Sequence, residues 1–272
     1  VLWGCAGLAR LVLAFMVGFV WWEAWPALTQ IGLRRFLVDP SWHPGEGDYL
    51  LLPMIMGTML TTLGAIVCAV PLGLGVAVFC QWYAPAILAN GVKLVLELLA
   101  GIPSVVYGLW GLVVLVPVIN RITPPGSSLL AGIVILAVMI LPTLALLTQA
   151  SLTAVPQDYV HSALALGLRR WSVICRIVIP AAKSGIVAAI LLATGRALGE
   201  TMAVLMVCGN VVQLPASLFD PIRTLAAHIA LEMAFALDLH RAALFVSGLV
   251  LAVMIAGLVG LGAWLSHAGY SR

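Results

Sequence analysis

The chain has 272 residues, of which 63% are hydrophobic and only 8% are charged. Soluble domains are about 45–50% apolar and about 25% charged, so this composition excludes a cytosolic enzyme, a nucleic-acid-binding protein, a coiled coil and a disordered chain. The net charge of +3 is too small to indicate a partner. We therefore expect an all-α membrane protein.

Six apolar stretches are long enough to cross a bilayer as helices, which takes roughly 20 residues each. They cover residues 8–29, 54–80, 94–119, 129–150, 184–208 and 242–266, and the polar segments between them cover residues 34–49, 81–93, 120–128, 151–183 and 209–241. We expect an N-terminal transmembrane helix and outer loop in residues 1–50 and a core of five transmembrane helices in residues 51–268.

The first apolar run ends in Trp21, Trp22 and Glu23 rather than in small residues, so we expect a membrane anchor and no cleavable signal peptide. The five cysteines are odd in number and have no Cys-x-x-Cys spacing, which predicts unpaired thiols. They are Cys5, Cys68, Cys80, Cys175 and Cys208.

The basic residues predict the orientation, because cytoplasmic loops carry an excess of Lys and Arg. With six spans both termini share one side, and that side has seven basic residues against five on the other. The seven are Arg10, Lys93, Arg169, Arg170, Arg176, Lys183 and Arg272, and the five are Arg34, Arg35, Arg121, Arg223 and Arg241. We therefore expect both termini in the cytoplasm.

Two of the four charged residues in or near the spans have simple explanations. Glu23 is expected to extend to the membrane surface, and Glu97 is expected to pair with Lys93 one helical turn earlier. Arg196 and Glu200 differ, because Arg196 stands at the middle of the fifth span. If the helix is continuous, the two residues share one face.

The Arg196–Glu200 face has two interpretations: an internal ion pair that fixes packing, or a polar lining of a substrate path. An arginine fork matches phosphate or carboxylate oxygens, and a carboxylate beside it accepts the proton of hydrogen phosphate, which sulfate lacks. Gly195 and Gly199 form a Gly-x-x-x-Gly pair beside this face, which predicts close approach of another helix.

The polar segment at residues 156–180 reads as two short amphipathic helices. Pro156 and Asp158 are start signals, and Gly167 permits the left-handed turn that ends the first helix. The second helix is expected over about residues 171–177, ending before Pro180. Helices this short need a partner or a membrane face, so a surface hairpin without a partner is the alternative.

This segment resembles the coupling motif of ABC-importer permeases, Glu-Ala-Ala, three residues, Gly, nine residues, Ile-x-Leu-Pro. The spacing from His161 through Gly167 to Pro180 matches, although His161 replaces the usual Glu and Ser162 the first Ala. The resemblance implies a type I importer permease fold, with a coupling helix between the fourth and fifth spans that inserts into an ATPase subunit. Its contact residues would be His161, Ala163, Leu164, Gly167 and Pro180.

Three longer blocks, at residues 101–111, 195–204 and 218–225, resemble the phosphate permeases of the PstC group. That resemblance covers about residues 50–265 and implies a non-enzymatic subunit in a bacterial inner membrane. Its partners would be a PstA-like permease, a PstB-like ATPase dimer that holds ATP and Mg, and a PstS-like periplasmic phosphate-binding protein. It also makes Arg196, Glu200 and Thr201 the residues expected to act in phosphate passage.

Two alternatives remain at this point. One keeps the ABC permease and changes the cargo to another oxyanion or an organic phosphate. The other is a secondary transporter or an intramembrane enzyme, which leaves the spacing from His161 to Pro180 unexplained. The chain has no phosphate-binding loop of the Gly-x-x-x-x-Gly-Lys-Ser/Thr type, and its five histidines are scattered, so we expect no cofactor or metal site.

Overall fold

The computed structural model describes residues 2–268, with side chains described for residues 4–262. Its helices are α1 (Leu2–Gln30), α2 (Arg35–Val38), α3 (Leu52–Trp82), α4 (Ala86–Gly101), α5 (Ser104–Trp110), η1 (Gly111–Leu115), α6 (Val116–Asn120), α7 (Leu129–Thr153), α8 (Gln157–Ala165), α9 (Arg170–Val173), η2 (Ile174–Val178), α10 (Ile179–Ala181), α11 (Lys183–Leu198), α12 (Met202–Val207), α13 (Leu225–Glu232) and α14 (Asp238–Ala268). The two short strands β1 (Trp42–His43) and β2 (Asp48–Tyr49) pair antiparallel.

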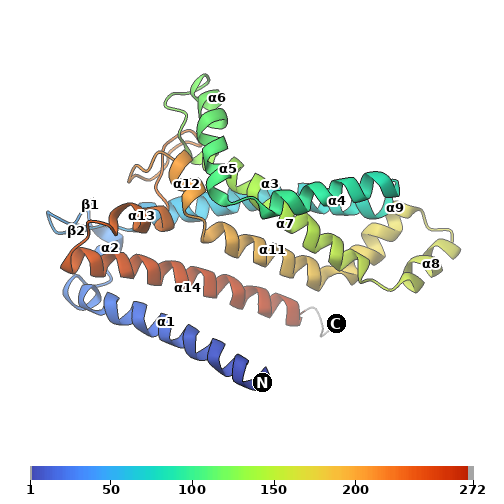
Figure 1. Cartoon of the computed structure of the whole chain (residues 1–272), viewed down its shortest axis with the longest axis horizontal. Coiled ribbons are helices and arrows are strands. Elements are labelled where there is room, and N and C mark those ends of the chain that lie inside the picture. The colour runs from blue at the N-terminus through green and yellow to red at the C-terminus, as the bar shows by residue number, and fades with distance from the viewer. Residues whose placement is uncertain (1, 269–272) are drawn as a thin grey trace.

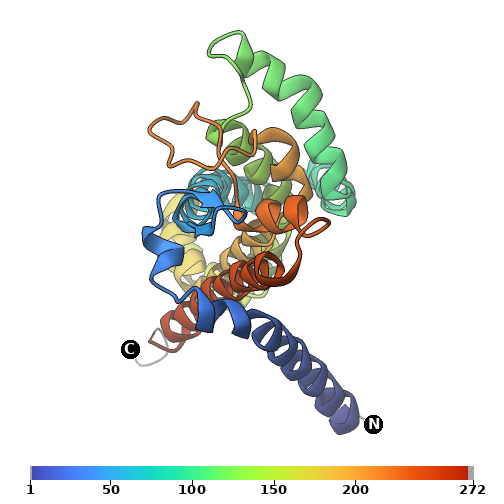
Figure 2. The same ribbon diagram turned by 90° about the vertical axis from the view of Figure 1, so that its left-hand side faces the viewer.

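The long helices run along one axis of an elongated molecule (Figure 1). α3 packs along α7, α11 packs on both α7 and α14, and α1 packs on α14. Viewed along the long axis, α1 diverges from the bundle on one side, and the segment from α5 to α6 projects on another (Figure 2).

Four of the six expected spans are confirmed as single long helices. α1, α3, α7 and α14 are each long and apolar enough to cross a membrane. α1, α3 and α7 contain an internal proline, at Pro26, Pro71 and Pro142 respectively, without a break in the helix. Neighbouring helices compensate for the backbone bond that a proline removes in such a bundle.

The third expected span is not one helix, which corrects the sequence analysis. α4 begins at Ala86, inside the segment expected to be a polar loop, and the helix direction turns by 96° between α4 and the α5–α6 segment. The turn lies at Ile102 and Pro103, both of which are extended. Proline disfavours helical geometry in the residue before it and lacks the N–H of the ladder. The Leu99 carbonyl accepts from the Ile102 amide over 3.2 Å and from the Tyr107 hydroxyl over 2.8 Å, so the second bond links the two sides of the break.

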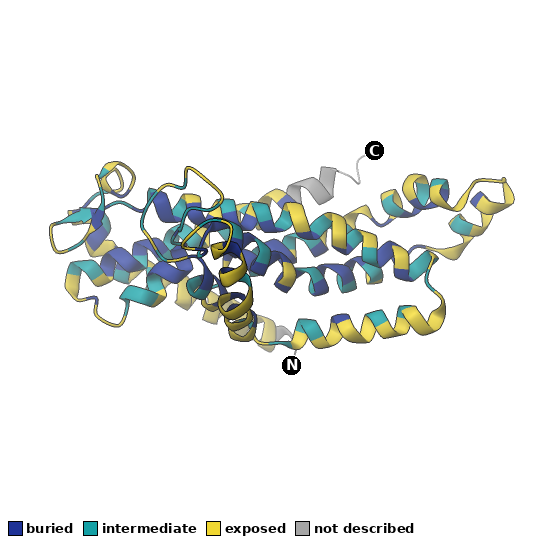
Figure 3. Ribbon diagram, turned by 90° about the horizontal axis from the view of Figure 1, so that it is seen from above, coloured by how far each residue is buried: buried dark blue, intermediate teal, exposed yellow. Residues whose placement is uncertain are grey.

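The core lies along α7, whose side chains pack against α3 and α11 (Figure 3). Most of α1 is exposed, as expected of a helix that faces lipid on nearly all sides. Only its last turns, around Ala24 and Ala27, are buried, against the β1–β2 hairpin and α14. The division at residues 50 and 51 stays a prediction.

The two ends of the bundle carry different segments. The N-terminal end of α1, the C-terminal end of α14 and the α8 helix lie toward one end, and β1, β2 and α13 lie toward the other (Figure 1). Up to six spans result if each of two bent helix pairs is one span, namely Ala86–Gly101 with Ser104–Asn120 and Arg170–Ala181 with Lys183–Leu198. We refer below to the end with β1, β2 and α13 as the outer end, after the orientation that the basic residues predict.

Candidate functional site

The fifth expected span is broken in its middle, which is the second correction to the sequence analysis. α11 ends at Leu198, and α12 begins at Met202 after the non-helical residues 199–201. The Glu200 amide donates to the Ala197 carbonyl over 3.3 Å, so the helix ends with a hydrogen bond to the residue three positions earlier instead of four. Discontinuous helices at membrane depth are a recurrent way to form transporter substrate sites.

Arg196 and Glu200 therefore do not share a helix face. The Arg196 guanidinium donates from Nη1 to the Thr143 hydroxyl on α7 over 3.2 Å. Glu200 Oε1 instead accepts from the Ala203 amide over 3.1 Å, at the first turn of α12. Among the described residues, no ion pair joins Arg196 to a carboxylate, which contradicts the internal ion pair considered from the sequence.

Helix dipoles favour this placement of both charges. Arg196 lies in the last turn of α11, where the helix dipole is negative, and Glu200 precedes α12, whose N-terminal end is positive. Both side chains are partly buried. Thr201, the third expected residue of this site, directs its hydroxyl to the Gly199 carbonyl at 3.3 Å. The break thus contains a guanidinium whose charge is not neutralised by any carboxylate of the described chain.

The expected close helix contact at Gly195 and Gly199 is absent from the described chain. A Cβ atom at Gly195 would meet nothing within 4 Å, and at Gly199 it would meet only the Gly195 carbonyl. The close contact lies elsewhere. A Cβ atom at Gly108 would come within 2.8 Å of the Ala203 Cα atom, so α5 and α12 pack with almost no space between them.

The three sequence blocks at residues 101–111, 195–204 and 218–225 form one continuous region. α5 from the first block packs on α12, which begins in the second block. The Ile222 amide of the third block donates to the Cys208 carbonyl just after α12, over 2.9 Å. The sequence alone gave no sign that these blocks, up to about 120 residues apart, are neighbours.

The expected coupling segment forms two helical pieces at the end of the bundle that carries the termini (Figure 1). Gly167 follows α8 with φ +79°, which confirms the expected left-handed turn. Ala163 is buried, while His161 and Leu164 are exposed. The roles of these residues in contact with an ATPase stay predictions.

The second piece of that segment is longer than expected. Helical structure continues from Arg170 to Ala181, and Pro180 lies within its last turn instead of beyond it. The π-helical turn η2 comes directly before α10, so Pro180 follows a local departure from the regular α-helical ladder. The chain then bends by 71° into α11.

A polar cluster at the outer end was missed by the sequence analysis. Glu232 on α13 accepts from the Trp42 indole over 2.8 Å and from Arg223 over 2.6 Å, and it contacts His240 of α14 at 2.9 Å. The fully buried His228 lies edge-on to the Trp42 ring. Arg223, His228, Glu232 and His240 are close in sequence but form no recognised motif, and Trp42 is 190 residues from Glu232, so only the fold brings Trp42 to the others.

Burial is the largest single influence on the pKa values of His228 and Glu232 in this cluster. Burial lowers the pKa of His228 to about 4, against the opposing attraction of Glu232, so this histidine is neutral at pH 7. Burial acts to raise the pKa of Glu232, but His228, the Trp42 and His240 hydrogen bonds and Arg223 outweigh it, and the pKa is lowered. Glu232 is therefore ionised within a shell of donors.

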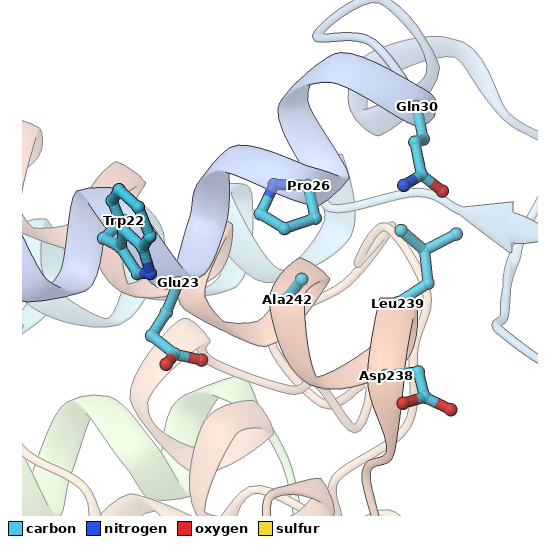
Figure 4. Close-up of a pocket in the computed structure, with 7 residues that line it drawn as sticks. All are labelled: Trp22, Glu23, Pro26, Gln30, Asp238, Leu239 and Ala242. Atoms are coloured by element: carbon cyan, nitrogen blue, oxygen red, sulfur yellow. The ribbon is translucent and has the colours of Figure 1, made fainter.

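The other two charged residues near the spans have partners. Glu23 lies 3.5 Å from the Arg241 guanidinium, and Lys93 lies 3.8 Å from Glu97, as expected. Glu23 also borders an open groove of about 340 Å³ between α1 and the start of α14 (Figure 4). The groove is lined by Trp22, Glu23, Pro26, Gln30, Asp238, Leu239 and Ala242 and does not include Arg196. Within the described chain, no group of three or more His, Cys, Asp or Glu residues could hold a metal ion.

The arrangement defines a class of protein: a helical membrane permease with broken spans around an unneutralised charge. Residues 69–268 match the family of binding-protein-dependent transport system inner membrane components. The chain belongs to this family and is a multi-pass membrane transport component, not an enzyme.

Relatives over most of the chain carry more specific names. The phosphate transport system permease protein PstC of Mesorhizobium japonicum is 39% identical over 253 residues, which are 85% of this chain and 77% of that protein. PstC of Pasteurella multocida is 36% identical over 89% of this chain and 82% of its own length. The probable ABC transporter permease protein YqgH of Bacillus subtilis is 40% identical over 81% of this chain and 73% of its own length.

Solved structures share the fold at low sequence identity. The inward-facing MetNI methionine ABC transporter matches with a TM-score of 0.68 and 18% identity, over 80% of this chain and 95% of that one. A bacterial alginate ABC transporter in complex with its alginate-bound periplasmic protein matches with a TM-score of 0.65 and 16% identity, over 97% and 96% of the two chains. These likenesses support the fold expected of an ABC-importer permease.

Proposed function

We propose that this chain is the transmembrane permease subunit of an ATP-driven importer that passes inorganic phosphate from an external binding protein to the cytoplasm. The observation that carries the proposal is the unneutralised Arg196 guanidinium at the break of the fifth span. The PstC names of relatives that cover most of the chain support phosphate as the cargo.

The hydrogen bonds around the break suit an oxyanion. Arginine has five N–H donors, and only one bond from Arg196 to a side chain is formed among the described residues. The remaining donors are available for phosphate oxygens in a bidentate arrangement. Glu200 uses one carboxylate oxygen for the Ala203 amide, so the other is available to accept the acidic proton of hydrogen phosphate.

The open surface around the break supports a second permease chain as partner. Gly195 has open space beside it, Glu200 is only partly buried, and Gly199 is exposed. Charged groups and non-helical backbone within a membrane face protein or a water-filled cavity and not lipid. A PstA-like permease that covers this face would complete the path between the two chains.

The remaining partners follow from the ends of the bundle. We place the exposed α8 helix and both termini in the cytoplasm, where α8 would contact a PstB-like ATPase dimer that holds ATP and Mg. The outer end would then face a PstS-like phosphate-binding protein in the periplasm. His161 would supply a hydrogen bond to the ATPase where the family pattern has a carboxylate.

Uptake of radiolabelled phosphate tests the proposal. Cells without other phosphate importers would express this chain with its partners, as the intact chain, as Arg196→Gln and as the control Arg10→Gln, which changes an exposed arginine on α1. We expect Arg196→Gln to assemble but lose most uptake, because glutamine offers hydrogen bonds without the charge. Arg10→Gln and excess unlabelled sulfate are expected to leave uptake unchanged.

Three outcomes would contradict different parts of this proposal. If Arg196→Gln is present in the membrane at the normal amount and takes up phosphate normally, then Arg196 at the break has no role in uptake. Uptake that is absent with all partners present would remove phosphate as the cargo and leave only the permease architecture. Competition by sulfate would instead contradict selectivity for phosphate over sulfate.

A further inference from the structure

The hydroxyl of Thr143 bonds to a neighbouring helix, unlike most helical hydroxyls of the membrane bundle that have a partner among the described residues. Such hydroxyls commonly donate to the carbonyl four residues earlier in the same helix. Thr61, Ser151 and Thr194 do so, over 2.7, 2.8 and 2.7 Å. Thr143 forms no such bond among the described residues, and its oxygen instead accepts from Arg196 on the neighbouring helix.

From this contact we propose that Thr143 is the positioning residue for Arg196 in anion passage. The proposal rests on the proposed function. An arginine side chain has many rotamers, and fixing one of them costs side-chain entropy. The bond to Thr143 holds one end of the guanidinium at α7, and its other donors form no hydrogen bond to a described side chain.

The chemistry of a hydroxyl suits this task better than that of a carboxylate. A carboxylate at residue 143 would neutralise Arg196 and compete with an incoming anion for the same donors. A neutral hydroxyl fixes the orientation and leaves the positive charge in place. Because the Thr143 oxygen acts as the acceptor, its own proton remains available to an anion oxygen held by Arg196.

Apolar packing between α7 and α11 fixes the backbone positions of Thr143 and Arg196. α7 and α11 pack closely along their length, and Leu144 and Ala197, the neighbours of the two residues, are both buried. Thr143 and Arg196 are themselves only partly buried. The backbones that carry the pair are thus fixed by apolar packing, while the polar groups remain accessible from the break.

The test compares Thr143→Val, which keeps the shape, with Thr143→Ser, which keeps the hydroxyl. Phosphate uptake would be measured across phosphate concentrations in the complete complex, normalised to the amount assembled. We expect maximal uptake to fall roughly tenfold in Thr143→Val, the size expected for a hydrogen bond to a charged group. The half-saturating concentration should stay unchanged, because an external receptor binds phosphate first.

Thr143→Ser is expected to retain most uptake, and this rescue distinguishes positioning from packing. The control is Thr29→Val on α1, whose hydroxyl bonds only the Trp25 and Pro26 carbonyls of its own helix among the described residues, over 3.0 and 3.1 Å, and which should match the intact chain. If Thr143→Val does not assemble, Thr143→Ala against Thr143→Ser gives the same comparison.

The inference would be overturned if the valine or alanine variant transports normally, or if the serine variant is as defective as they are. Arg196→Gln in the same assay separates the two proposals. Loss of uptake there with normal uptake in Thr143→Val would overturn only the positioning role. Normal uptake in Arg196→Gln would overturn the role of Arg196 and with it the positioning role, whereas phosphate uptake that is absent from the intact complex would overturn the proposed function itself.

Discussion

Arg196 shows how a buried charge is accommodated without an opposite charge. Its partner is a neutral hydroxyl at 3.2 Å, and it sits in the last turn of α11, where the helix dipole favours a cation. The sequence singled out Arg196 and Glu200 because charges are rare in apolar spans. It predicted the wrong geometry between them, because the residues that end α11 include no proline and resemble ordinary small residues of a membrane helix.

Gly167, which follows α8, is a second single residue on which we expect function to depend. Its φ of +79° is unfavourable for a residue with a Cβ atom, by roughly 1–2 kcal/mol, although nothing lies within 4 Å of that position. We expect Gly167→Val to distort the turn after α8 and to uncouple ATP hydrolysis from uptake. Gly167→Asn is the matched control, because asparagine tolerates the left-handed conformation. The measurement is stimulated ATPase activity together with uptake in the reconstituted complex, and equal behaviour of the two variants would contradict a role for this turn.

Two broken helices define the middle of the molecule. The break between α4 and α5 and the break between α11 and α12 are adjacent, because α5 packs directly on α12. Apolar length and composition predicted α1, α3, α7 and α14 well. They failed at Pro103, because Pro71 and Pro142 lie in equally apolar runs and leave their helices continuous. Whether a proline breaks a membrane helix depends on the packing around it, which sequence periodicity does not report.

Gly108 is where the contact between these elements is most sensitive. A methyl group there would come within 2.8 Å of the Ala203 backbone, which cannot move without displacing α12. We expect Gly108→Ala to lower the stability of the assembled protein by about 1–3 kcal/mol, as overpacking generally does. Gly91→Ala on α4, where nothing lies within 4 Å, should be neutral or slightly stabilising. Thermal unfolding of both purified variants checks the difference, and equal midpoints would show that α5 and α12 are not tightly packed.

At the scale of the whole molecule, the outer cluster joins four segments that the membrane spans alone would not hold together. Glu232 links the hairpin residue Trp42, the loop residue Arg223 and the α14 residue His240. Its donors surround a charge that would otherwise be costly to bury. The cluster thereby fixes the outer end to the span that continues to the opposite end of the bundle.

This cluster predicts that the protein loses stability in mild acid. The pKa of His228 is about 4 in the folded protein against 6.5 ordinarily, so below about pH 6.5 the unfolded chain binds a proton that the folded chain does not. Stability should therefore fall as the pH drops from 6.5 toward 4, by on the order of 2 kcal/mol at pH 5. The lowered pKa of Glu232 adds a further loss below pH 4.5.

The measurement is the thermal midpoint at pH 7.5 and pH 5. His228→Gln should lower the midpoint at pH 7.5 but show a smaller decrease on acidification than the intact protein. His43→Gln, which changes an exposed histidine, should retain the full decrease. An unchanged acid sensitivity in His228→Gln would show that another group is responsible.

The placement of Arg196 at the end of α11 also sets how strongly an anion could be held there. The dipole of α11 contributes roughly half a negative charge at its C-terminal end and so offsets part of the guanidinium charge. The break therefore presents a reduced positive potential, and an anion is attracted but not trapped. A conduction pathway needs such a balance, because an ion that binds too tightly at its midpoint leaves too slowly. The broken helix would thus limit the residence time of its cargo.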